Sequence, residues 1–579
     1  MILKLLVAVF WGLGVSALSY AQGVTQAQED ESRQLQNEEI LRQQQREQQR
    51  KELEETIPNV HLPGGEVKSQ SFAIPENESP CFIINELEIV GEEAEQFQWA
   101  RWGVLLNPRI NSPGILGKCL GAQGINSALK QVQNAIIKEG FITTRVLASP
   151  QNLKTGKLQL SVIPGKIRSI VFKEGADFRA QQFNALPMSS GDLLNLRDIE
   201  QGLENFKRLP TVEADIKIKP AEGDGAKPGE SDLDIEWAQA NPFRFSLSLD
   251  DSGAKSTGKL LGSATVSHDH WFTLNDLFYF NYVQNVGGED KGKRGNSSYT
   301  MHYSLPFGYW LLGVNISKSR YFQTVAGAFQ NYTYKGVSRK KEIKLSRVFY
   351  RDAVRKSTLS VSAYLKKSRN HIDDTEVLVQ RRRTAGWQAN ISHKEFFGKS
   401  VFEGNLNYQH GTGMWNALAP PEEEFSEGSW PVVISSDARL TIPLLISSQR
   451  FRYGGYWHRQ WNKRALLIQD QFSIGGRHTV RGFDGRQSLL AERGWLMRNT
   501  LSAAIEQTGF EIYAGLDHGR VSGPSAEFLL GNKLTGGVLG VRGQYKGLSL
   551  DYFVGRPLSR PEGFVTDSTT TGFNLNLSF

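Results

Sequence analysis

The chain has 579 residues, and its 67 basic and 60 acidic side chains leave a formal net charge of +7. This length is too great for one ordinary domain, and the negative mean hydropathy argues against a helical membrane protein. The basic excess is small and spread along the chain, so it does not indicate nucleic-acid binding. We therefore expect several domains and no nucleic-acid partner.

The N-terminus carries a targeting signal. Residues 5–18 form the only long apolar run, preceded by Lys4 and followed by Ser19-Tyr20-Ala21, a small-x-small pattern. We interpret residues 1–21 as a signal peptide, so that the mature chain begins near Gln22. A membrane anchor is the alternative, but the run is shorter than the ~20 residues of a spanning helix.

Export bears on the two cysteines, Cys81 and Cys119, because a structural disulfide persists in an oxidising compartment. No nearby histidine supplies a base for a catalytic thiol, and the wide spacing suits no zinc site. We predict a Cys81–Cys119 disulfide, with two free buried thiols as the alternative.

Residues 22–57 are rich in Gln, Glu and Arg and contain no Pro or Gly between Glu29 and Glu55, which favours a solvated helix. Apolar residues are too sparse to bury this helix in a dry core, so it must lie in water, along a polar surface or inside a wet channel. Residues 58–79 hold several Pro and Gly residues and are predicted to be an extended linker.

Two tandem α+β modules are predicted next, at residues 80–165 and 166–240. The first has apolar strands at 82–90, 142–147 and 157–162 and helices that include one at 125–138. The second repeats the order, with strands at 167–172, 212–218 and 233–237 and a helix at 196–207. Open strand edges of such modules can recruit an extended partner segment, whereas a spacer without a binding role is the alternative.

Residues 241–579 consist of strands that alternate apolar with polar residues, as in 243–250, 402–409, 510–517 and 548–555. A soluble sandwich also alternates, but its sheets usually stay small, and here the pattern continues for about 340 residues. Charged residues recur on the polar faces and aromatic residues on the apolar faces. The pattern predicts a transmembrane antiparallel β-barrel of about 16 strands around a wet lumen.

Two stretches in the barrel go beyond alternation: Val480-Arg481-Gly482-Phe483 and Gly515-Leu516-Asp517-His518-Gly519. Asp517 has the parity of the polar strand face and is expected to point into the lumen, where a carboxylate needs a cation. Arg481 lies on a glycine-flanked loop that can approach it. His518 lies on the opposite face, so a catalytic dyad with Asp517 is not expected.

These stretches resemble the BamA-like superfamily, in which a VRGF loop enters the lumen and binds the Asp of a GxDxG strand. The N-terminal half is similar to the two-partner secretion transporters of that superfamily, the TpsB class or ShlB/FhaC/HecB haemolysin-activator family. The similarity lies in Ser79-Pro80-Cys81-Phe82, Gly117-Lys118-Cys119-Leu120 and the segments 140–146 and 162–167, and in the order of signal peptide, helix, linker, modules and barrel.

The resemblance implies that the modules are periplasmic POTRA domains and that the 22–57 helix plugs the lumen, a helix free in the periplasm being the alternative. It assigns a lumen lock to Val480, Arg481, Gly482, Phe483, Gly515, Asp517 and Gly519. The terminal Phe579 resembles the signal read by the barrel-assembly machinery, although it is also simply a last lipid-facing residue.

The implied function is an outer-membrane translocase of two-partner (type Vb) secretion. The POTRA domains would recognise a large TpsA-like exoprotein of the haemagglutinin, haemolysin or contact-dependent-inhibition type, and the barrel would export it unfolded. The sequence shows no phosphate-binding loop, HExxH or nucleophile elbow, so we expect no enzyme, catalytic residue, cofactor or metal. A BamA-like insertase, a plugged porin-type channel and an adhesin are the alternatives.

Overall fold

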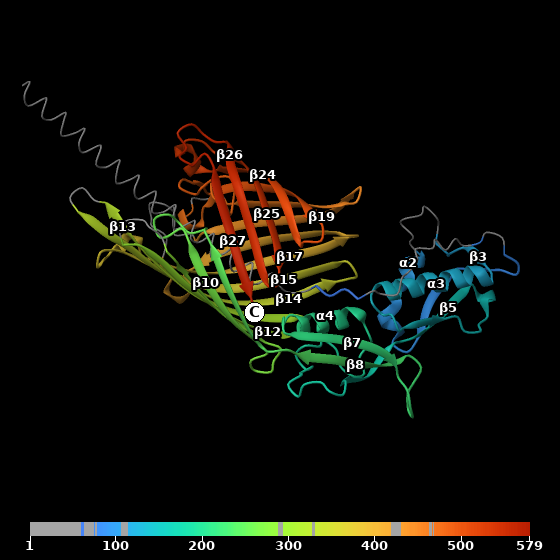
Figure 1. Cartoon of the computed structure of the whole chain (residues 1–579). Coiled ribbons are helices and arrows are strands. Elements are labelled where there is room, and N and C mark those ends of the chain that lie inside the picture. The colour runs from blue at the N-terminus through green and yellow to red at the C-terminus, as the bar shows by residue number, and fades with distance from the viewer. Residues whose placement is uncertain are drawn as a thin grey trace, which may run out of the picture.

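The computed structural model describes residues 59–62, 75, 78–105, 114–287, 293–326, 330–418, 430–462, 466 and 468–579. The predicted signal peptide and the predicted plug helix lie outside these residues, as does most of the linker. Two α+β modules lead to a large β-barrel, and the second module lies between the first module and the barrel (Figure 1). None of the helices in the described part of the chain is long and apolar enough to cross a membrane.

The first module packs one long helix, α3 (Ala122–Lys138), on two small sheets. Its other elements are β1 (Phe82–Ile84), β2 (Glu86–Gly91), a 3-10 helix (Ala94–Arg101), α2 (Trp102–Leu105), β3 (Lys118–Leu120), β4 (Arg145–Leu147), a 3-10 turn (Leu153–Thr155) and β5 (Lys157–Ile163). The strand predicted at 82–90 is divided, because β1 pairs with β3 whereas β2 pairs with β5 in the sheet β2-β5-β4. The apolar side of α3 is buried through Ala128, Val132 and Ile136.

The N-terminal end of α3 is capped from the linker. The Glu78 carboxylate accepts hydrogen bonds from the backbone N–H groups of Gly121, Gln123 and Gly124 at 2.7, 2.8 and 2.9 Å. Partial desolvation raises the pKa of Glu78, but these hydrogen bonds outweigh it and leave the pKa below its usual value. Cys81 and Cys119 form a disulfide, so the last linker residues and the start of the module are each fixed to the segment that leads into α3.

The second module has the sheet β6-β8-β7, made of β6 (Lys166–Phe172), β7 (Val212–Pro220) and β8 (Glu230–Gln239), and one helix, α4 (Leu196–Lys207). Asn195 caps α4 by accepting a hydrogen bond from the N–H of Arg197 at 2.8 Å. Ile199, Leu203 and Phe206 are buried in the core of the module. The bounds of α4 agree with the predicted helix at 196–207.

Sixteen long strands in the described part of the chain close into an antiparallel barrel, as predicted. They are β9 (Phe243–Asp250), β10 (Leu261–Asp269), β11 (Leu277–Asn285), β12 (Gly295–Phe307), β13 (Trp310–Ala326), β14 (Asn331–Arg351), β15 (Arg355–Ile372), β17 (Arg382–Phe397), β18 (Ser400–Thr412), β19 (Val432–Ile446), β20 (Gln449–Trp461), β23 (Arg493–Ile505), β24 (Phe510–Ser522), β25 (Lys533–Tyr545), β26 (Leu548–Ser559) and β27 (Thr570–Ser578). The two-residue strand β16 (Thr375–Glu376) pairs antiparallel with the end of β15. The last strand pairs with the first over five positions, Asn574–Ser578 with Asp250–Ser246.

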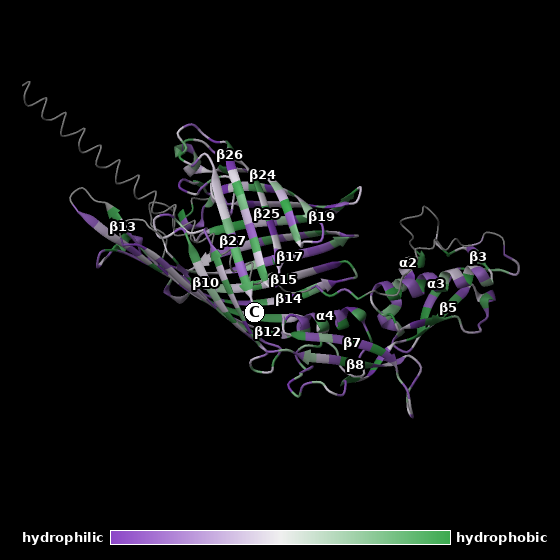
Figure 2. Cartoon of the chain, in the orientation of Figure 1, coloured by the Kyte–Doolittle hydropathy of each residue, from purple (hydrophilic) through white to green (hydrophobic). Residues whose placement is uncertain are grey.

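The barrel turns its apolar face outward. Ile512 and Leu516 on β24 are 55% and 52% exposed, whereas Asp517 on the opposite face of that strand is fully buried. Figure 2 shows hydrophobic and hydrophilic residues alternating along the barrel strands. This is the reverse of a soluble sandwich and matches a barrel with lipid outside and polar side chains inside.

The barrel is taller on one side than a membrane requires. β14 has 21 residues, which at ~3.4 Å each span about 70 Å, whereas the apolar band of an outer-membrane barrel is about 25 Å tall. The ends of β13 and β14 that are remote from the modules therefore project beyond the membrane (Figure 1).

The second module is docked on the rim of the barrel through the polar side of α4 and its C-terminal end. Arg208 donates to the Ser304 hydroxyl at 2.8 Å and to the Asn275 carbonyl at 2.7 Å. Asn205 donates to the Gly308 carbonyl at 2.8 Å, and Tyr309 donates to Asp198 at 2.5 Å. Both sides of α4 are thus buried, one in its own module and one against barrel turns.

Candidate functional site

The central site is a loop between β20 and β23 that folds against the inner face of the barrel. We call residues 475–488 the lumen loop. Its Arg481 donates to both oxygens of Asp517 on β24, from Nε at 2.7 Å and Nη2 at 2.7 Å, and its backbone N–H donates to the same carboxylate at 2.9 Å. Asp517 is fully buried and Arg481 is 7% exposed. The pair is a buried, bidentate ion pair with a third hydrogen bond, which makes the loop position specific.

Apolar residues on either side of Arg481 fix the lumen loop. Val480 and Phe483 are buried in a cluster with Ile474 and Leu534, and the Phe483 ring meets Phe564 edge-on at 5.8 Å between centroids. The loop is thus held by packing as well as by charge.

Glycines let the loop approach the strands. Gly482 has φ +102°, a conformation that favours glycine. A Cβ atom on Gly515 would lie 2.6 Å from Nη2 of Arg481, and one on Gly519 would lie 3.0 Å from side-chain carbons of Ile474 and Val480. The seven residues that the sequence assigned to the lock are therefore brought together in one place.

Arg498 and Gly536 belong to the same site, although no motif in the sequence marks them. Arg498 on β23 stands directly opposite Asp517 in the strand register, and its Nε lies 3.6 Å from the carboxylate. A Cβ atom on Gly536 of β25 would lie 1.9 Å from the carbonyl oxygen of Arg481. Strand register is the signal that would have identified both residues, and it cannot be read without knowing which strands are neighbours.

The lumen also contains a cavity of about 590 Å³ away from the lock, on the inner faces of β13, β14, β15 and β17. Its wall includes the basic residues Lys340, Lys366 and Arg382 and the acidic residues Glu342 and Asp470. A hydrated, charged interior of this kind can accommodate a polar polypeptide segment.

In the described part of the chain, each module's sheet ends in strands without a strand partner on the outer side, and at β4 the Gln133 side chain bonds to the Thr144 carbonyl and the Val146 N–H. In the order β2-β5-β4, the outer strands are β2 and β4, and in β6-β8-β7 they are β6 and β7. Leu147 on β4 and Val171 on β6 are 49% and 47% exposed. An open edge with exposed apolar side chains suits the addition of an extended partner segment.

Other predicted residues lie apart from the lock. The disulfide is in the first module, and Phe579 closes the barrel seam, where its N–H donates to the Phe245 carbonyl at 2.9 Å. His518 shares a 2.8 Å hydrogen bond with the Thr535 hydroxyl instead of contacting Asp517. Within the described ranges, no three His, Cys, Asp or Glu side chains are grouped to hold a metal ion.

Comparison with known proteins agrees with this architecture. POTRA domains match residues 109–165 (ShlB-type) and 166–220, which places one in each α+β module. A closed barrel with an apolar exterior, an internal loop and POTRA domains in front defines an outer-membrane transporter with periplasmic domains. The chain belongs to the family described as haemolysin secretion/activation protein ShlB/FhaC/HecB, which matches residues 229–543.

Relatives extend the match to nearly the whole chain. The outer membrane transporter CdiB-2 of Burkholderia pseudomallei (strain 1026b) is 34% identical over 93% of this chain and 94% of its own length. The hemolysin transporter protein ShlB of Serratia marcescens is 27% identical over 70% of this chain and 72% of its own. The structure of CdiB from Acinetobacter baumannii superposes with a TM-score of 0.83 at 30% identity, covering 94% of this chain and 99% of that one.

The chain is thus an outer-membrane transporter of the two-partner secretion class, with its POTRA domains in the periplasm. The sequence-based family, fold class and location are confirmed. We refer to the first and second modules as POTRA 1 and POTRA 2 from here on.

Proposed function

We propose that this transporter exports one large TpsA-like exoprotein, which POTRA 1 and POTRA 2 receive as an extended chain and the barrel passes outward unfolded. The observation that carries the proposal is the continuous path: open sheet edges in both modules, POTRA 2 docked on the barrel rim, and a polar lumen behind it. Folding of the exoprotein outside would make export directional, because it removes translocated chain from the equilibrium.

The relatives favour one class of exoprotein. The matches named CdiB cover 93–99% of this chain, whereas those named hemolysin transporter cover 70%. We therefore favour an exoprotein of the contact-dependent-inhibition type over a haemolysin or haemagglutinin. Transport of this kind needs no enzymatic activity, cofactor or nucleic acid from the chain itself.

The Arg481–Asp517 pair is proposed to lock the lumen loop in the resting state. Its burial and its three hydrogen bonds support this role. The 22–57 helix is proposed as the plug, and it carries more acidic than basic residues, opposite in sign to the basic residues around the lumen cavity. The same proposal includes the signal peptide, the domain boundaries and contact with outer-membrane lipid. It also includes recognition of Phe579 by the barrel-assembly machinery.

The test is secretion of the N-terminal fragment of the exoprotein encoded in the adjoining reading frame, in cells with and without this chain. Appearance of the fragment in the medium only when the transporter is present supports the proposal. Secretion that is indifferent to the transporter contradicts it, and single-channel recording would then examine a porin-type role.

A further inference from the structure

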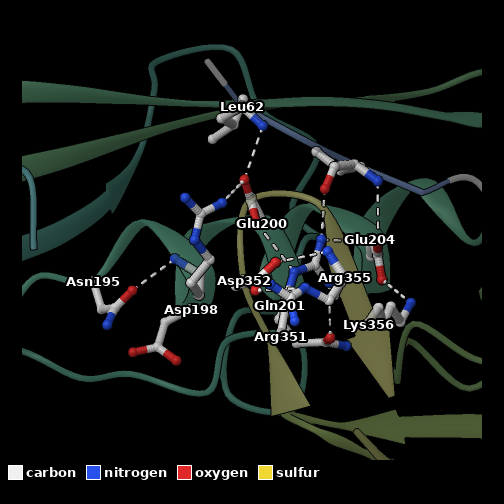
Figure 3. A network of polar contacts seen from close by, with 12 residues as sticks. Leu62, Asn195, Asp198, Glu200, Gln201, Glu204, Arg351, Asp352, Arg355 and Lys356 are labelled. Carbon is white, nitrogen blue, oxygen red and sulfur yellow. Dashed lines mark hydrogen bonds and ion pairs between the residues drawn. The ribbon is translucent and has the colours of Figure 1, made fainter. Parts of the chain in front are cut away.

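A short segment of the linker, Val60–Leu62, lies in the junction between POTRA 2 and the barrel (Figure 3). The N–H of Val60 donates to Oε1 of Glu204 at 3.0 Å, and the N–H of Leu62 donates to Oε1 of Glu200 at 2.9 Å. The carbonyl oxygen of Val60 accepts from Nη2 of Arg351 at 2.5 Å. We call residues 60–62 the strap.

The groups that hold the strap come from two domains. Glu200 and Glu204 project from α4 of POTRA 2, and Arg351 and Lys356 are cross-strand neighbours at the rim end of β14 and β15. We call these four residues the rim clamp. Figure 3 shows them converging below the strap.

The rim clamp is complete without the strap. Arg351 bonds to Glu200 at 3.1 Å and to Glu204 at 3.0 Å, and Lys356 bonds to Glu204 at 2.5 Å. The side chains of Arg351, Glu200 and Glu204 are 2%, 0% and 3% exposed. Because these ion pairs do not involve the strap, they hold the two carboxylates in place when the strap leaves, with oxygen lone pairs available for other N–H donors.

The hydrogen bonds of the clamp are made to main chain, while the side chains of Val60 and Leu62 pack against the core of POTRA 2. All three hydrogen bonds to the strap end on backbone N–H or C=O groups, and they come from residues 60 and 62, which have the same parity in an extended chain. The side chain of His61 makes a different contact, edge-on to the Phe396 ring at 4.6 Å between centroids. Any extended polypeptide with two N–H groups at this spacing offers the same hydrogen-bonding atoms, as in strand addition to a sheet edge, and apolar side chains on those two residues reproduce the packing as well.

We propose that the rim clamp is a binding site for an extended segment of the exported polypeptide, and that the strap fills it in the resting transporter as a tethered competitor. The proposal rests on the proposed function and names a third contact point after the two POTRA edges. The strap that fills the site is itself a polypeptide segment bound through its main chain, and the site lies between α4 of POTRA 2 and the rim end of β14 and β15 (Figure 3). A tether gives the strap a high local concentration, so a bound exoprotein segment displaces it only when other contacts also hold the exoprotein.

The test places the photo-crosslinking residue p-benzoylphenylalanine at Phe396, which faces the strap, in the full-length transporter. Cells also make the N-terminal fragment of the exoprotein encoded in the adjoining reading frame. Val60→Pro/Leu62→Pro removes both strap N–H donors, and the matched control Val60→Ala/Leu62→Ala keeps them while trimming both side chains. Heat-modifiable migration on gels verifies that each variant has a folded barrel.

We expect a fragment adduct from position 396 in the otherwise unsubstituted transporter, and several-fold more of it in the proline variant than in the alanine control. Secretion of the fragment without any adduct overturns the clamp proposal alone, as does an equal yield from the proline and alanine variants. Absence of secretion by the transporter without strap substitutions overturns the proposed function itself, so the two failures are distinguishable.

Discussion

Removal of the Asp517 carboxylate is expected to release the lumen loop. Asp517→Ala leaves Arg481 and Arg498 without the anion that both contact, and the three hydrogen bonds from Arg481 are lost. Breaking a buried ion pair from one side costs about 3–5 kcal/mol. Since each 1.4 kcal/mol is tenfold, the population with an open loop should rise by at least about 10².

A buried thiol in the loop reports this change. Ser488 is 5% exposed, and its hydroxyl makes no hydrogen bond to the described part of the chain, so Ser488→Cys is a mild substitution. Cys81 and Cys119 are joined and do not react with a maleimide. The labelling rate of the new thiol follows the open population when reclosure is fast, so Asp517→Ala should accelerate labelling about a hundredfold or more.

The matched control is Glu511→Ala. Glu511 is a carboxylate on the same strand and the same face, and it is also paired with two arginines, Arg452 and Arg542, but it does not contact the lumen loop. If the thiol at position 488 in Asp517→Ala is labelled within threefold of its rate in Glu511→Ala, the lock is refuted. In Arg481→Ala/Asp517→Ala the free energy lost from the closed state of the loop should be clearly smaller than the sum of the losses in the two single variants. The reason is that neither an unpaired Asp517 nor an unpaired Arg481 remains.

Three further predictions concern the lumen loop, POTRA 1 and POTRA 2. Gly536→Ala places a Cβ 1.9 Å from the carbonyl oxygen of Arg481 and should also accelerate labelling of the thiol at position 488. Gly454→Ala is the control, because its Cβ would lie 4.0 Å from the nearest atom, and it should not change the labelling rate. Cys81→Ser/Cys119→Ser opens a covalent loop with a sequence separation of 38 and should destabilise POTRA 1 by up to about 4 kcal/mol. The measurement is the urea midpoint of that module, which should fall. An unchanged midpoint would contradict this prediction. Burial raises the pKa of Glu204, but Lys356 and Arg351 outweigh it and leave the pKa below 4.5. The stabilisation from the ionised Glu204 is therefore complete above pH 4.5 and is lost as the pH falls through the lowered pKa. Glu204→Gln lacks this titrating group. The urea midpoint of POTRA 2 should therefore fall more steeply in acid for the natural chain than for Glu204→Gln.

Local patterns were sufficient to predict most elements of the fold. Period-two alternation identified β9, β18, β24 and β26, because lipid outside and water inside impose opposite demands on successive side chains. The helix at 196–207 was found from its own apolar spacing. The strand at 82–90 was wrong as a single element, because its two halves pair with different sheets, and pairing is a tertiary property.

Contacts between distant segments could not be read from the sequence. Arg481 and Asp517 were paired through a motif, but Arg498 joins them only through the register of β23 and β24. Glu78 looked like an ordinary linker residue and proved to be a helix cap. Glu200 and Glu204 on α4 are buried against Arg351 and Lys356, which follow about 150 residues later, and the apolar spacing of the helix carries no sign of this contact.

Reconstitution of the purified transporter shows whether the exoprotein passes through this barrel. The purified full-length chain would be inserted into liposomes, and the unfolded N-terminal fragment of the exoprotein would be added on the POTRA side, with protease protection of the fragment as the measurement. We expect protected fragment in liposomes that contain the transporter and none in empty liposomes or in liposomes with an unrelated porin. Fragment that binds the POTRA domains but stays fully digestible would contradict export through this barrel.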